Sequence, residues 1–571
     1  MRIKIIAWIA AFLFLLLFFG ILNLSLIQGE KFRQLSNKNC IRLFSQEGSR
    51  GRILDRNNNA IVDNTLSYDV MVLSQENKEQ LKKTLLSLSD MLGVNFDALQ
   101  KKFKSGIVSA SMPVEVAKNI DIKKAFVLEE SKMDLPGLIV QPHPLRHYPC
   151  GRLASHVLGY LNEIDRWRLT KLEDYGYKTK DIVGFGGIEE QYDYYLRQED
   201  GGLSVEVDHK GRFRRIVGFK APQSGKDIQL TLDFKIQKIV EDVLEDRKGS
   251  VVILDPNTGE VIAMASKPDF SPAVFVKRSS SIIRNLFRDS DGPLFNRAIS
   301  GGYPAGSIFK MIVACAALEN NKIKKNTSFS CEGAFNLGEQ EFACWDMHGM
   351  QDLISAITHS CNVFFYRTGL LVGPELIHEY ALKFGLSKPT GIELPYETAG
   401  FIPDPMWKKI YRLKNWFNGD TVNLSIGQGD VLVTPLQAAR MVSVFANNGN
   451  LIYPHIIKSI DGKEVSADYR KLTGLSLKPA TLDYIRAGLR QVVSDPTGTA
   501  NVLADLPVSV AGKTGTAQVS RGQPHAWFVG FFPFKEPKFA ICVFLENGGA
   551  GHGAAALARK IIDAMIKEGL V

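Results

Sequence analysis

The sequence has little net charge of either sign, which argues against a nucleic-acid-binding protein. Its 571 residues include 69 basic and 60 acidic side chains, a formal charge of +9, and both signs are mixed along the chain. A nucleic-acid-binding surface would concentrate positive charge, so we expect no nucleic-acid partner. The milder inference is a basic surface facing an anionic envelope polymer or lipid headgroups. The length exceeds what one compact core accommodates, which predicts two or more domains.

Long apolar runs are also scarce, because only one occurs, at residues 5–29. At about 1.5 Å per residue it exceeds the roughly 30 Å hydrocarbon core of a bilayer. Arg2 and Lys4 precede it, which favours a cytoplasmic N-terminus. The run is long for a signal peptide and no small-x-small pattern closes it, so we expect an uncleaved anchor rather than a cleaved signal. The remaining chain is then predicted to lie outside the cytoplasmic membrane.

The chain after the anchor changes pattern near residue 230. Residues 76–133 carry helix formers with apolar spacing suited to amphipathic helices. The Gly-bearing segments 148–160 and 184–189 lack a nucleophile paired with a base. Their glycines are therefore expected to fix turns and close packing rather than to bind phosphate.

The second part of the chain has strand patterns at both ends and a helical middle. Four segments have the pattern of sheet strands: 249–256, 259–265, 525–531 and 539–545. Residues 554–567 have the pattern of a closing helix. The arrangement predicts an α+β fold in which a sheet packs against helices and a helix from the middle of the chain is buried between them.

Residues 306–310 (GSIFK) are the most informative segment. Ser307 and Lys310 are three residues apart, so a helix places both side chains on one face. A Lys amine kept unprotonated by burial and by a neighbouring positive charge can take the proton of a serine hydroxyl. Two fixed residues recur by chance, and Ser307 alone could be a helix N-cap. The motifs 360–362 (SCN) and 513–515 (KTG) follow in order, which favours one catalytic cleft.

These three motifs, together with segment 427–429 (GQG), resemble the class B penicillin-binding proteins. Segments 205–215, 296–310 and 545–551 are most similar to the elongation-specific branch, penicillin-binding protein 2, rather than to its division-specific paralogue. Residues 41–225 resemble the non-catalytic pedestal of the same family.

The resemblance implies an α+β protein with a single N-terminal transmembrane helix, an elongated mixed α/β pedestal and a transpeptidase domain with an antiparallel sheet. The expected boundaries are a cytoplasmic tail at 1–4, an anchor at 5–27, a pedestal of the dimerisation type at 28–230 and a transpeptidase domain at 231–571.

The resemblance also implies a role for each motif residue. Ser307 would attack the carbonyl of D-Ala at position four of a stem pentapeptide and form an acyl-enzyme. Lys310 would act as the acylation base. Ser360 would relay a proton toward the leaving amine, and the Asn362 amide would hold Lys310 and the substrate backbone.

The third motif would bind the substrate from an edge strand. Lys513 would meet the terminal carboxylate and lower the proton affinity of Lys310, and Thr514 and Thr516 hydroxyls would bind the same carboxylate. Gly515 would leave room for a substrate strand. The backbone N–H groups of Thr516 and Ser307 would form the oxyanion hole.

A separate constellation could hold a metal. Its spacing is C-x12-C-x3-H-x12-C, and it consists of Cys331, Cys344, His348 and Cys361. Four such ligands suffice for a closed tetrahedral zinc site, which would fix the loop carrying Ser360 and Asn362. A Cys331–Cys344 disulfide and ordinary buried thiols are the alternatives. No cofactor is expected for the chemistry itself.

The resemblance implies a penicillin-sensitive D-Ala-D-Ala transpeptidase that cross-links peptidoglycan during cell-wall elongation, with β-lactams as inhibitors. It further implies a single-pass protein of the bacterial inner membrane with its catalytic domain outside, and a membrane glycosyltransferase of the shape, elongation, division and sporulation family as partner. Alternatives are a scaffold that activates the glycosyltransferase, a β-lactam-sensing or β-lactam-hydrolysing enzyme and a DD-carboxypeptidase. A class A hydrolase needs a Glu-x-x-Leu-Asn run, and we find none.

Overall fold

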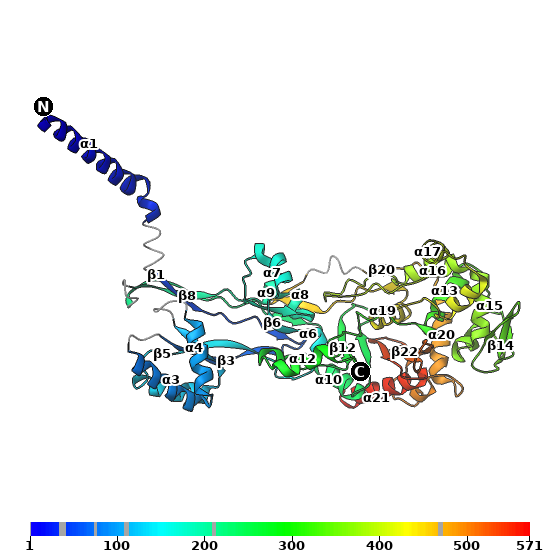
Figure 1. The fold of residues 1–571 in the computed structure, drawn as a ribbon. Helices are drawn as coiled ribbons and strands as arrows, with labels where there is room; N and C mark the ends of the chain where they lie inside the picture. The colour runs from blue at the N-terminus through cyan, green and yellow to red at the C-terminus, as the bar shows by residue number, and fades with distance from the viewer. Residues whose placement is uncertain (1, 33–40, 74–76, 108–112, 208–212, 466–471) are drawn as a thin grey trace. The chain divides into compact units, whose positions relative to one another are not determined.

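The computed structural model describes residues 2–32, 41–73, 77–107, 113–207, 213–465 and 472–571. The chain divides into two compact units (Figure 1). The first comprises residues 1–51, 64–147 and 197–225, and the second comprises residues 52–63, 148–196 and 226–571. Each unit is described by itself below.

The chain begins with the apolar helix α1 (Arg2–Leu22), which continues through a π-helical turn (Asn23–Ile27). Residues Ile3–Ile27 are long and apolar enough to cross a bilayer, and their side chains are almost all exposed in the structure. An isolated helix that exposes Leu, Ile and Phe on every side is suited to lipid rather than to water. The observation is consistent with a single-pass membrane anchor.

After helix α1, the described part of the first unit contains two sheets and the α-helices α3, α4 and α5. β1 (Ile41–Gln46), β8 (Gly201–Val207) and β9 (Phe213–Lys220) form an antiparallel sheet in the order β1-β8-β9. In the other sheet β3 (Ala60–Val72) pairs with β4 (Val114–Ile120) and β5 (Leu138–His147). The helices are α3 (Lys78–Leu92), α4 (Phe96–Gly106) and α5 (Ile122–Glu130).

Local sequence explains where these helices begin. The side chains of Asn77, Asn95 and Asp121 accept hydrogen bonds from backbone N–H groups in the first turns of α3, α4 and α5. Residues 76–133 were predicted to form helices, but strand β4 lies between α4 and α5 in this region. Alternating buried and partly exposed residues at the start of β4 let it pair with β3.

The second unit is built on a five-stranded antiparallel sheet in the order β12-β11-β23-β22-β21. Its strands are β11 (Gly249–Leu254), β12 (Val261–Lys267), β21 (Ala511–Ala517), β22 (His525–Phe532) and β23 (Phe539–Leu545). The strands predicted from both ends of this region therefore join in one sheet, and β21 lies at its edge. β11, β22 and β23 are buried along their whole length, which requires cover on both faces.

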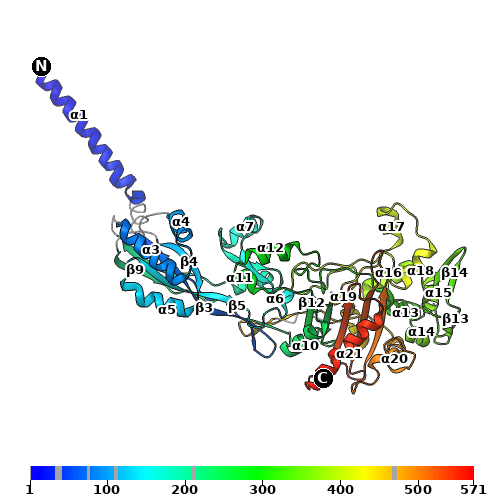
Figure 2. The ribbon, with the colours of Figure 1, turned by 60° about the horizontal axis from the view of Figure 1, so that its bottom comes forward.

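Helices provide that cover. α10 (Phe234–Leu244) and α21 (Gly551–Lys567) pack on the sheet and on each other (Figure 2). α19 (Pro435–Ala446) packs against β11, β22 and β23 and is buried from end to end. α13 (Lys310–Glu319) is buried at all eight positions from Lys310 to Ala317. A helix that is apolar on nearly every side belongs in such a core, and its one charged buried residue, Lys310, stands out.

The remaining helices of the second unit surround this core. They are α6 (Ser155–Leu158), α7 (Arg166–Leu172), α8 (Gly187–Gln191), α9 (Asp193–Leu196), α11 (Ala273–Val276), α12 (Ser280–Arg288), α14 (Leu353–Thr358), α15 (Asn362–Val372), α16 (Pro374–Lys383), α17 (Pro405–Tyr411), α18 (Asn418–Ser425) and α20 (Pro479–Ser494). Its short strands are β2 (Ile53–Leu54), β6 (Tyr160–Glu163), β7 (Ile182–Phe185), β10 (Ile228–Leu230), β13 (Phe329–Cys331), β14 (Ala334–Leu337), β15 (Gln340–Ala343), β16 (Gly349–Gln351), β17 (Asn450–Leu451), β18 (Ile457–Ile460), β19 (Lys463–Glu464) and β20 (Thr473–Gly474).

The two glycine-bearing segments, 148–160 and 184–189, pack against each other as expected. A Cβ added at Gly159 would lie 2.0 Å from the carbonyl oxygen of Gly186, and one at Gly187 would lie 2.3 Å from the carbonyl oxygen of Val157. Real Cβ atoms do not approach backbone so closely, so these glycines permit backbone-to-backbone packing.

Candidate functional site

Ser307 lies in a 3-10 turn (Gly306–Phe309) that leads directly into α13. Gly306 has φ +56°, and its N–H donates to the carbonyl oxygen of Gly427 at 2.9 Å. A Cβ at Gly306 would lie 2.7 Å from the carbonyl oxygen of Thr516. Gly306, Ile308 and Phe309 are buried, whereas Ser307 is partly exposed. The turn therefore presents one hydroxyl to solvent between β21 and the Gly427 segment.

Lys310 is fully buried and binds the Ser360–Asn362 motif. Its Nζ donates to the carbonyl oxygen of Ser360 at 2.7 Å, to Oδ1 of Asn362 at 2.7 Å and to Oγ of Ser360 at 3.3 Å. Burial lowers the pKa of Lys310 to about 8, against the opposing charges of Cys344 and Cys361. The structure thus brings two of the three predicted motifs together around one amine that can be neutral near physiological pH.

Ser360 adopts a strained backbone conformation. It has φ +55° in the junction between α14 and α15 and is almost fully buried. The left-handed region is unfavourable for a residue with a side chain, and such residues gather at functional sites. Cys361 follows as the N-cap of α15, and Asn362 is the first residue of that helix. The sharp change of direction lets adjacent side chains face opposite ways.

The third motif lies on the edge strand β21. Lys513 is fully buried, and its Nζ donates to the carbonyl oxygen of Thr514 at 3.0 Å. Burial, followed by the positive charge of Lys310, lowers the pKa of Lys513 well below its usual value. The positive charge of Lys310 thus lowers the pKa of Lys513, whereas the lowered pKa of Lys310 is caused by burial.

The neighbours of Lys513 bind other parts of the unit. The Thr514 hydroxyl donates to Oγ1 of Thr499 at 2.7 Å, and the Gly551 N–H donates to Oγ1 of Thr516 at 3.0 Å. A Cβ at Gly515 would lie 3.0 Å from Cγ2 of Ile308. Gly515 thus makes room for the serine-bearing turn, a packing reason that differs from the expected close approach of substrate.

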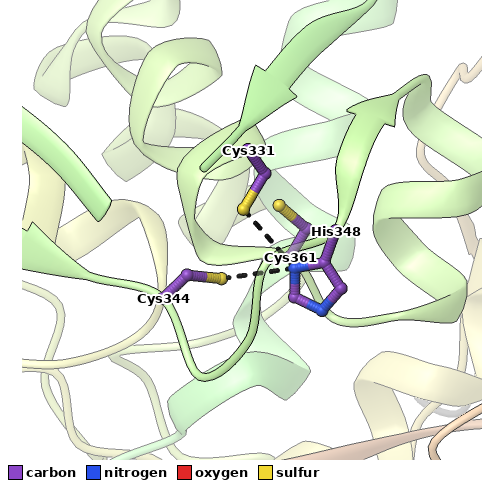
Figure 3. Close-up of side chains that lie close together, drawn as sticks. All are labelled: Cys331, Cys344, His348 and Cys361. Carbon is purple, nitrogen blue, oxygen red and sulfur yellow. Dashed lines mark hydrogen bonds between the residues drawn. The ribbon is translucent and has the colours of Figure 1, made fainter. Parts of the chain in front are cut away.

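The four predicted metal ligands converge on one point (Figure 3). Their ligand atoms all lie within 4.8 Å of one another. Nδ1 of His348 lies 3.5 Å from Sγ of Cys331 and 3.6 Å from Sγ of Cys344. The backbone N–H of Asn362 donates to Sγ of Cys344 at 3.2 Å. Cys361 is buried on the side of this cluster, as expected for a residue between two cleft residues.

The spacing of these atoms fits a tetrahedral ion. With metal–sulfur and metal–nitrogen bonds of about 2.3 Å and about 2.0 Å, tetrahedral geometry puts sulfur and nitrogen about 3.5 Å apart. A hydrogen bond with Cys361 lowers the pKa of the Cys344 thiol and raises that of Cys361. A thiolate is therefore available for metal binding. The cysteines of the described residues are free thiols, so the Cys331–Cys344 disulfide is not formed; Cys40 lies outside the described residues.

Comparison with protein families shows that the sequence forming this site matches a known domain. The model of the penicillin-binding protein transpeptidase domain matches residues 249–563, and that of the penicillin-binding protein dimerisation domain matches residues 45–230. The chain belongs to the penicillin-binding proteins.

Among these penicillin-binding proteins, the peptidoglycan D,D-transpeptidase MrdA of Acinetobacter baumannii is 32% identical over 95% of this chain and 84% of its own length. The MrdA of Escherichia coli is 32% identical over 97% of this chain and 93% of its own length. The chain is thus homologous to the elongation-type branch over nearly its full length.

Solved structures agree. Penicillin-binding protein 2 of Helicobacter pylori, in a complex with MreC, matches 93% of this chain and 99% of its own, with a TM-score of 0.83 and 28% identity. A structure of a peptidoglycan synthase complex contains a chain that matches 99% of this one and 98% of its own, with a TM-score of 0.74 and 30% identity. The predicted architecture, an N-terminal apolar helix with a pedestal domain and a transpeptidase domain, is confirmed.

Sequence reasoning missed several residues that contact the motifs of this penicillin-binding protein. Thr499 holds the Thr514 hydroxyl, Gly551 holds Thr516, and Nε2 of Gln428 donates to the carbonyl oxygen of Thr516 at 3.5 Å. Gln428 lies in the GQG segment that supported the resemblance, which was a usable signal. Gly551 ends segment 545–551, which also supported the resemblance, whereas Thr499 carries no local pattern because its contact depends on how distant segments meet.

Proposed function

We propose that this chain is a peptidoglycan D,D-transpeptidase that works through an acyl-enzyme on Ser307. The observation that carries the proposal is the buried Lys310 amine, held by Ser360 and Asn362 and placed one helical turn after an accessible serine. An amine with a pKa of about 8 is a competent base near neutral pH.

The proposed acylation assigns one event to each group. Oγ of Ser307 forms a bond to the carbonyl carbon of the fourth residue, D-Ala, of the stem pentapeptide, and its proton passes to Nζ of Lys310. For this transfer Nζ exchanges one of its bonds to the Ser360–Asn362 motif for one to Ser307. The tetrahedral intermediate then expels the terminal D-Ala, whose amine receives a proton through the hydroxyl of Ser360. The amine of a neighbouring stem peptide attacks the ester and releases Ser307.

Substrate recognition is proposed for the β21 side. The terminal carboxylate of the stem lies near Lys513 and the hydroxyls of Thr514 and Thr516. A carboxylate beside the buried Lys513 amine raises its pKa, so binding restores the ammonium that burial disfavours. The backbone N–H groups of Ser307 and Thr516 are the proposed oxyanion donors.

The cellular setting follows from the anchor and the relatives. We place the chain in the bacterial inner membrane with residues 1–4 in the cytoplasm, the anchor at 5–27, the pedestal at 28–230 and the transpeptidase domain at 231–571 outside. Relatives have been solved with MreC and in a peptidoglycan synthase complex, which supports a membrane glycosyltransferase as a partner of this chain during elongation.

A structural zinc ion at the four-ligand cluster completes the proposal. Cys331, Cys344, His348 and Cys361 would hold it, and the ion would fix the turn that carries Ser360 and Asn362 without touching the substrate. Metal analysis of protein purified without chelator or added metal is the direct test. We expect about one zinc per chain in the parent and none in Cys331→Ser, and an absence of zinc in the folded parent contradicts the proposal.

The function is tested by labelling the purified full chain with a fluorescent penicillin, followed by a chase with excess unlabelled competitor over hours. Stable label in the parent and none in Ser307→Ala is the expected result. Ser520→Ala is the matched control, because Ser520 is exposed after β21 and should leave labelling unchanged. Rapid loss of label indicates a hydrolase, and a folded parent that never labels indicates a scaffold.

The acceptor step needs its own measurement. The acylated chain is incubated with a stem peptide that carries a free amine, and the products are separated by mass. Transfer to the amine supports transpeptidation, and release of the free acid alone indicates a DD-carboxypeptidase.

A further inference from the structure

Helix α17 and the segment that joins it to α18 expose several large apolar side chains. They are Met406 (71% exposed), Ile410 (57%), Tyr411 (75%), Leu413 (86%) and Phe417 (65%). We call this surface the 406–417 patch. Figures 1 and 2 place α17 at the outer edge of the second unit. A contiguous group of exposed apolar side chains on a soluble domain usually marks a binding surface.

Positive charge is interleaved with these apolar side chains. Lys408, Lys409, Arg412 and Lys414 lie within ten residues of one another. Lys408 pairs with Asp420, and Arg412 pairs with Asp430 at 3.1 Å. Lys409 and Lys414 are exposed and form no ion pair among the described residues. The surface therefore offers free cations beside apolar rings.

Aromatic rings of the same segment contact two of its cationic side chains, Lys408 and Arg412. Nζ of Lys408 lies 5.8 Å from the ring centre of Trp416 and 5.6 Å from that of Phe417. The guanidinium of Arg412 lies 5.4 Å from the ring centre of Trp407, which in turn packs on Phe401. Such cation–π contacts restrict long side chains, so the patch is organised before any ligand arrives.

The chain that forms the patch continues into the cleft. α18 begins at Asn418, directly after the patch, and packs against α15, the helix that begins with Asn362. Asp430, the partner of Arg412, is two residues from Gln428, and two residues span at most about 7 Å. The side chain of Gln428 contacts the carbonyl oxygen of Thr516. The patch is thus connected, through Arg412 and Asp430, to the segment that contacts the proposed substrate site.

We propose that the 406–417 patch binds the peptidoglycan strand that extends beyond the cleft. This inference rests on the proposed function, because a stem peptide in the cleft is attached to a glycan whose neighbouring sugars and stems must lie outside it. The apolar faces of sugar rings pack on exposed aromatic side chains, and the carboxylates of neighbouring stem peptides pair with Lys409 and Lys414.

The composition favours this occupant over a protein partner. The centre of a protein–protein interface is depleted of lysine, whereas the patch alternates lysine with apolar residues. A polyanion with apolar sugar faces matches both components along its length.

The test measures binding of the full chain to purified peptidoglycan sacculi. The chain is held in amphipol, which covers the anchor, and its cleft is first blocked with penicillin so that retention reports the patch alone. Pelleting with increasing amounts of sacculi gives the affinity. Tyr411→Ala and the double variant Lys409→Glu/Lys414→Glu are each expected to weaken binding about tenfold, the equivalent of about 1.4 kcal/mol.

Matched controls come from the same unit. Tyr175→Ala removes a tyrosine of similar exposure (68%), and Lys322→Glu/Lys324→Glu reverses two exposed lysines outside residues 406–417. Both controls are expected to bind like the parent. Every sample is also labelled with fluorescent penicillin before blocking, so failure of the proposed function shows as lost label and is separate from failure of the patch.

Three results overturn the proposal. Patch variants that bind sacculi like the parent show that the surface does not contact the polymer. Pelleting of the parent with vesicles of anionic phospholipid, but not with sacculi, assigns the patch to a lipid surface. A dimer of the parent that light scattering finds abolished in the patch variants, with sacculus binding unchanged, assigns it to a second copy of the chain.

Discussion

The candidate site has two sides that hold their functional groups by different means. On the serine side, the turn Gly306–Phe309, α13 and β21 carry Ser307, Lys310 and Lys513 on regular structure that the sheet and its helices enclose. On the other side, Ser360 and Asn362 lie at a helix junction whose strained backbone is supported from behind by the thiol cluster. The first side therefore depends on packing in the core of the unit, and the second depends on the local contacts of the Cys331, Cys344, His348 and Cys361 cluster.

Loss of the base should have the largest effect. In Lys310→Ala the serine keeps its turn but loses its proton acceptor, and general-base catalysis is typically worth about 10²- to 10⁴-fold. Stopped-flow measurement of penicillin acylation should show a fall in this range. A rate within threefold of the parent would falsify the assignment of Lys310 as the base.

A change in the packing of the serine side should come next. Gly306→Ala forces a Cβ to within 2.7 Å of the Thr516 carbonyl oxygen at a positive φ, which displaces Ser307 from β21. We expect acylation to slow about 10²-fold, as when one oxyanion donor is lost. Gly338→Ala is the control, because Gly338 also has a positive φ but has no atom within 4 Å of an added Cβ. Equal losses in the two variants would show that backbone strain alone is responsible.

The pH dependence should be intermediate in size. The neutral form of Lys310 is the proposed base, and its pKa in the folded protein is about 8. Acylation should therefore be near its maximum above pH 8 and fall about tenfold per pH unit below it, as the amine becomes protonated. Initial acylation rates from pH 6 to 9 check this. A flat profile across that range contradicts a titrating Lys310.

The smallest effect is expected from changes to the cluster behind Ser360 and Asn362. Cys331→Ser removes one ligand of the cluster but no proposed catalytic residue, so acylation should slow about tenfold, the low end of the losses that follow changes around metal sites. Chelator treatment of the parent should produce the same loss, and added zinc should restore the parent but not the variant. Full activity in both metal-free forms would show that the Ser360 turn needs no support from the cluster.

The fold and most of the candidate site could be predicted from sequence where local pattern or motif spacing decides structure. The apolar run, the strands 249–256 and 539–545 and the closing helix follow from hydrophobic periodicity. Convergence of Cys361 with the other three ligands was predicted from ligand spacing and from its place between two cleft residues.

Other features depend on contacts between residues far apart in the chain and could not be predicted from the sequence. β4 was hidden inside a helical pattern because its partner β3 lies some fifty residues earlier. The contact of Gly515 with Ile308 and the bond between Thr514 and Thr499 arise only when β21 meets segments far away in sequence. The packing of Gly515 against Ile308 was therefore missed, although the glycine itself was singled out, and room for a substrate strand stays a prediction.

The complete enclosure of α13 has a consequence for how the protein fails under stress. A helix buried on all sides cannot open by local fraying, so its exposure requires the surrounding core to unfold as one cooperative unit. Penicillin reactivity should then persist during heating until that core melts, and it should vanish at the same temperature as the near-UV signal of the buried aromatic side chains. The covalent label of this enzyme would serve as a reporter of global folding as well as of activity.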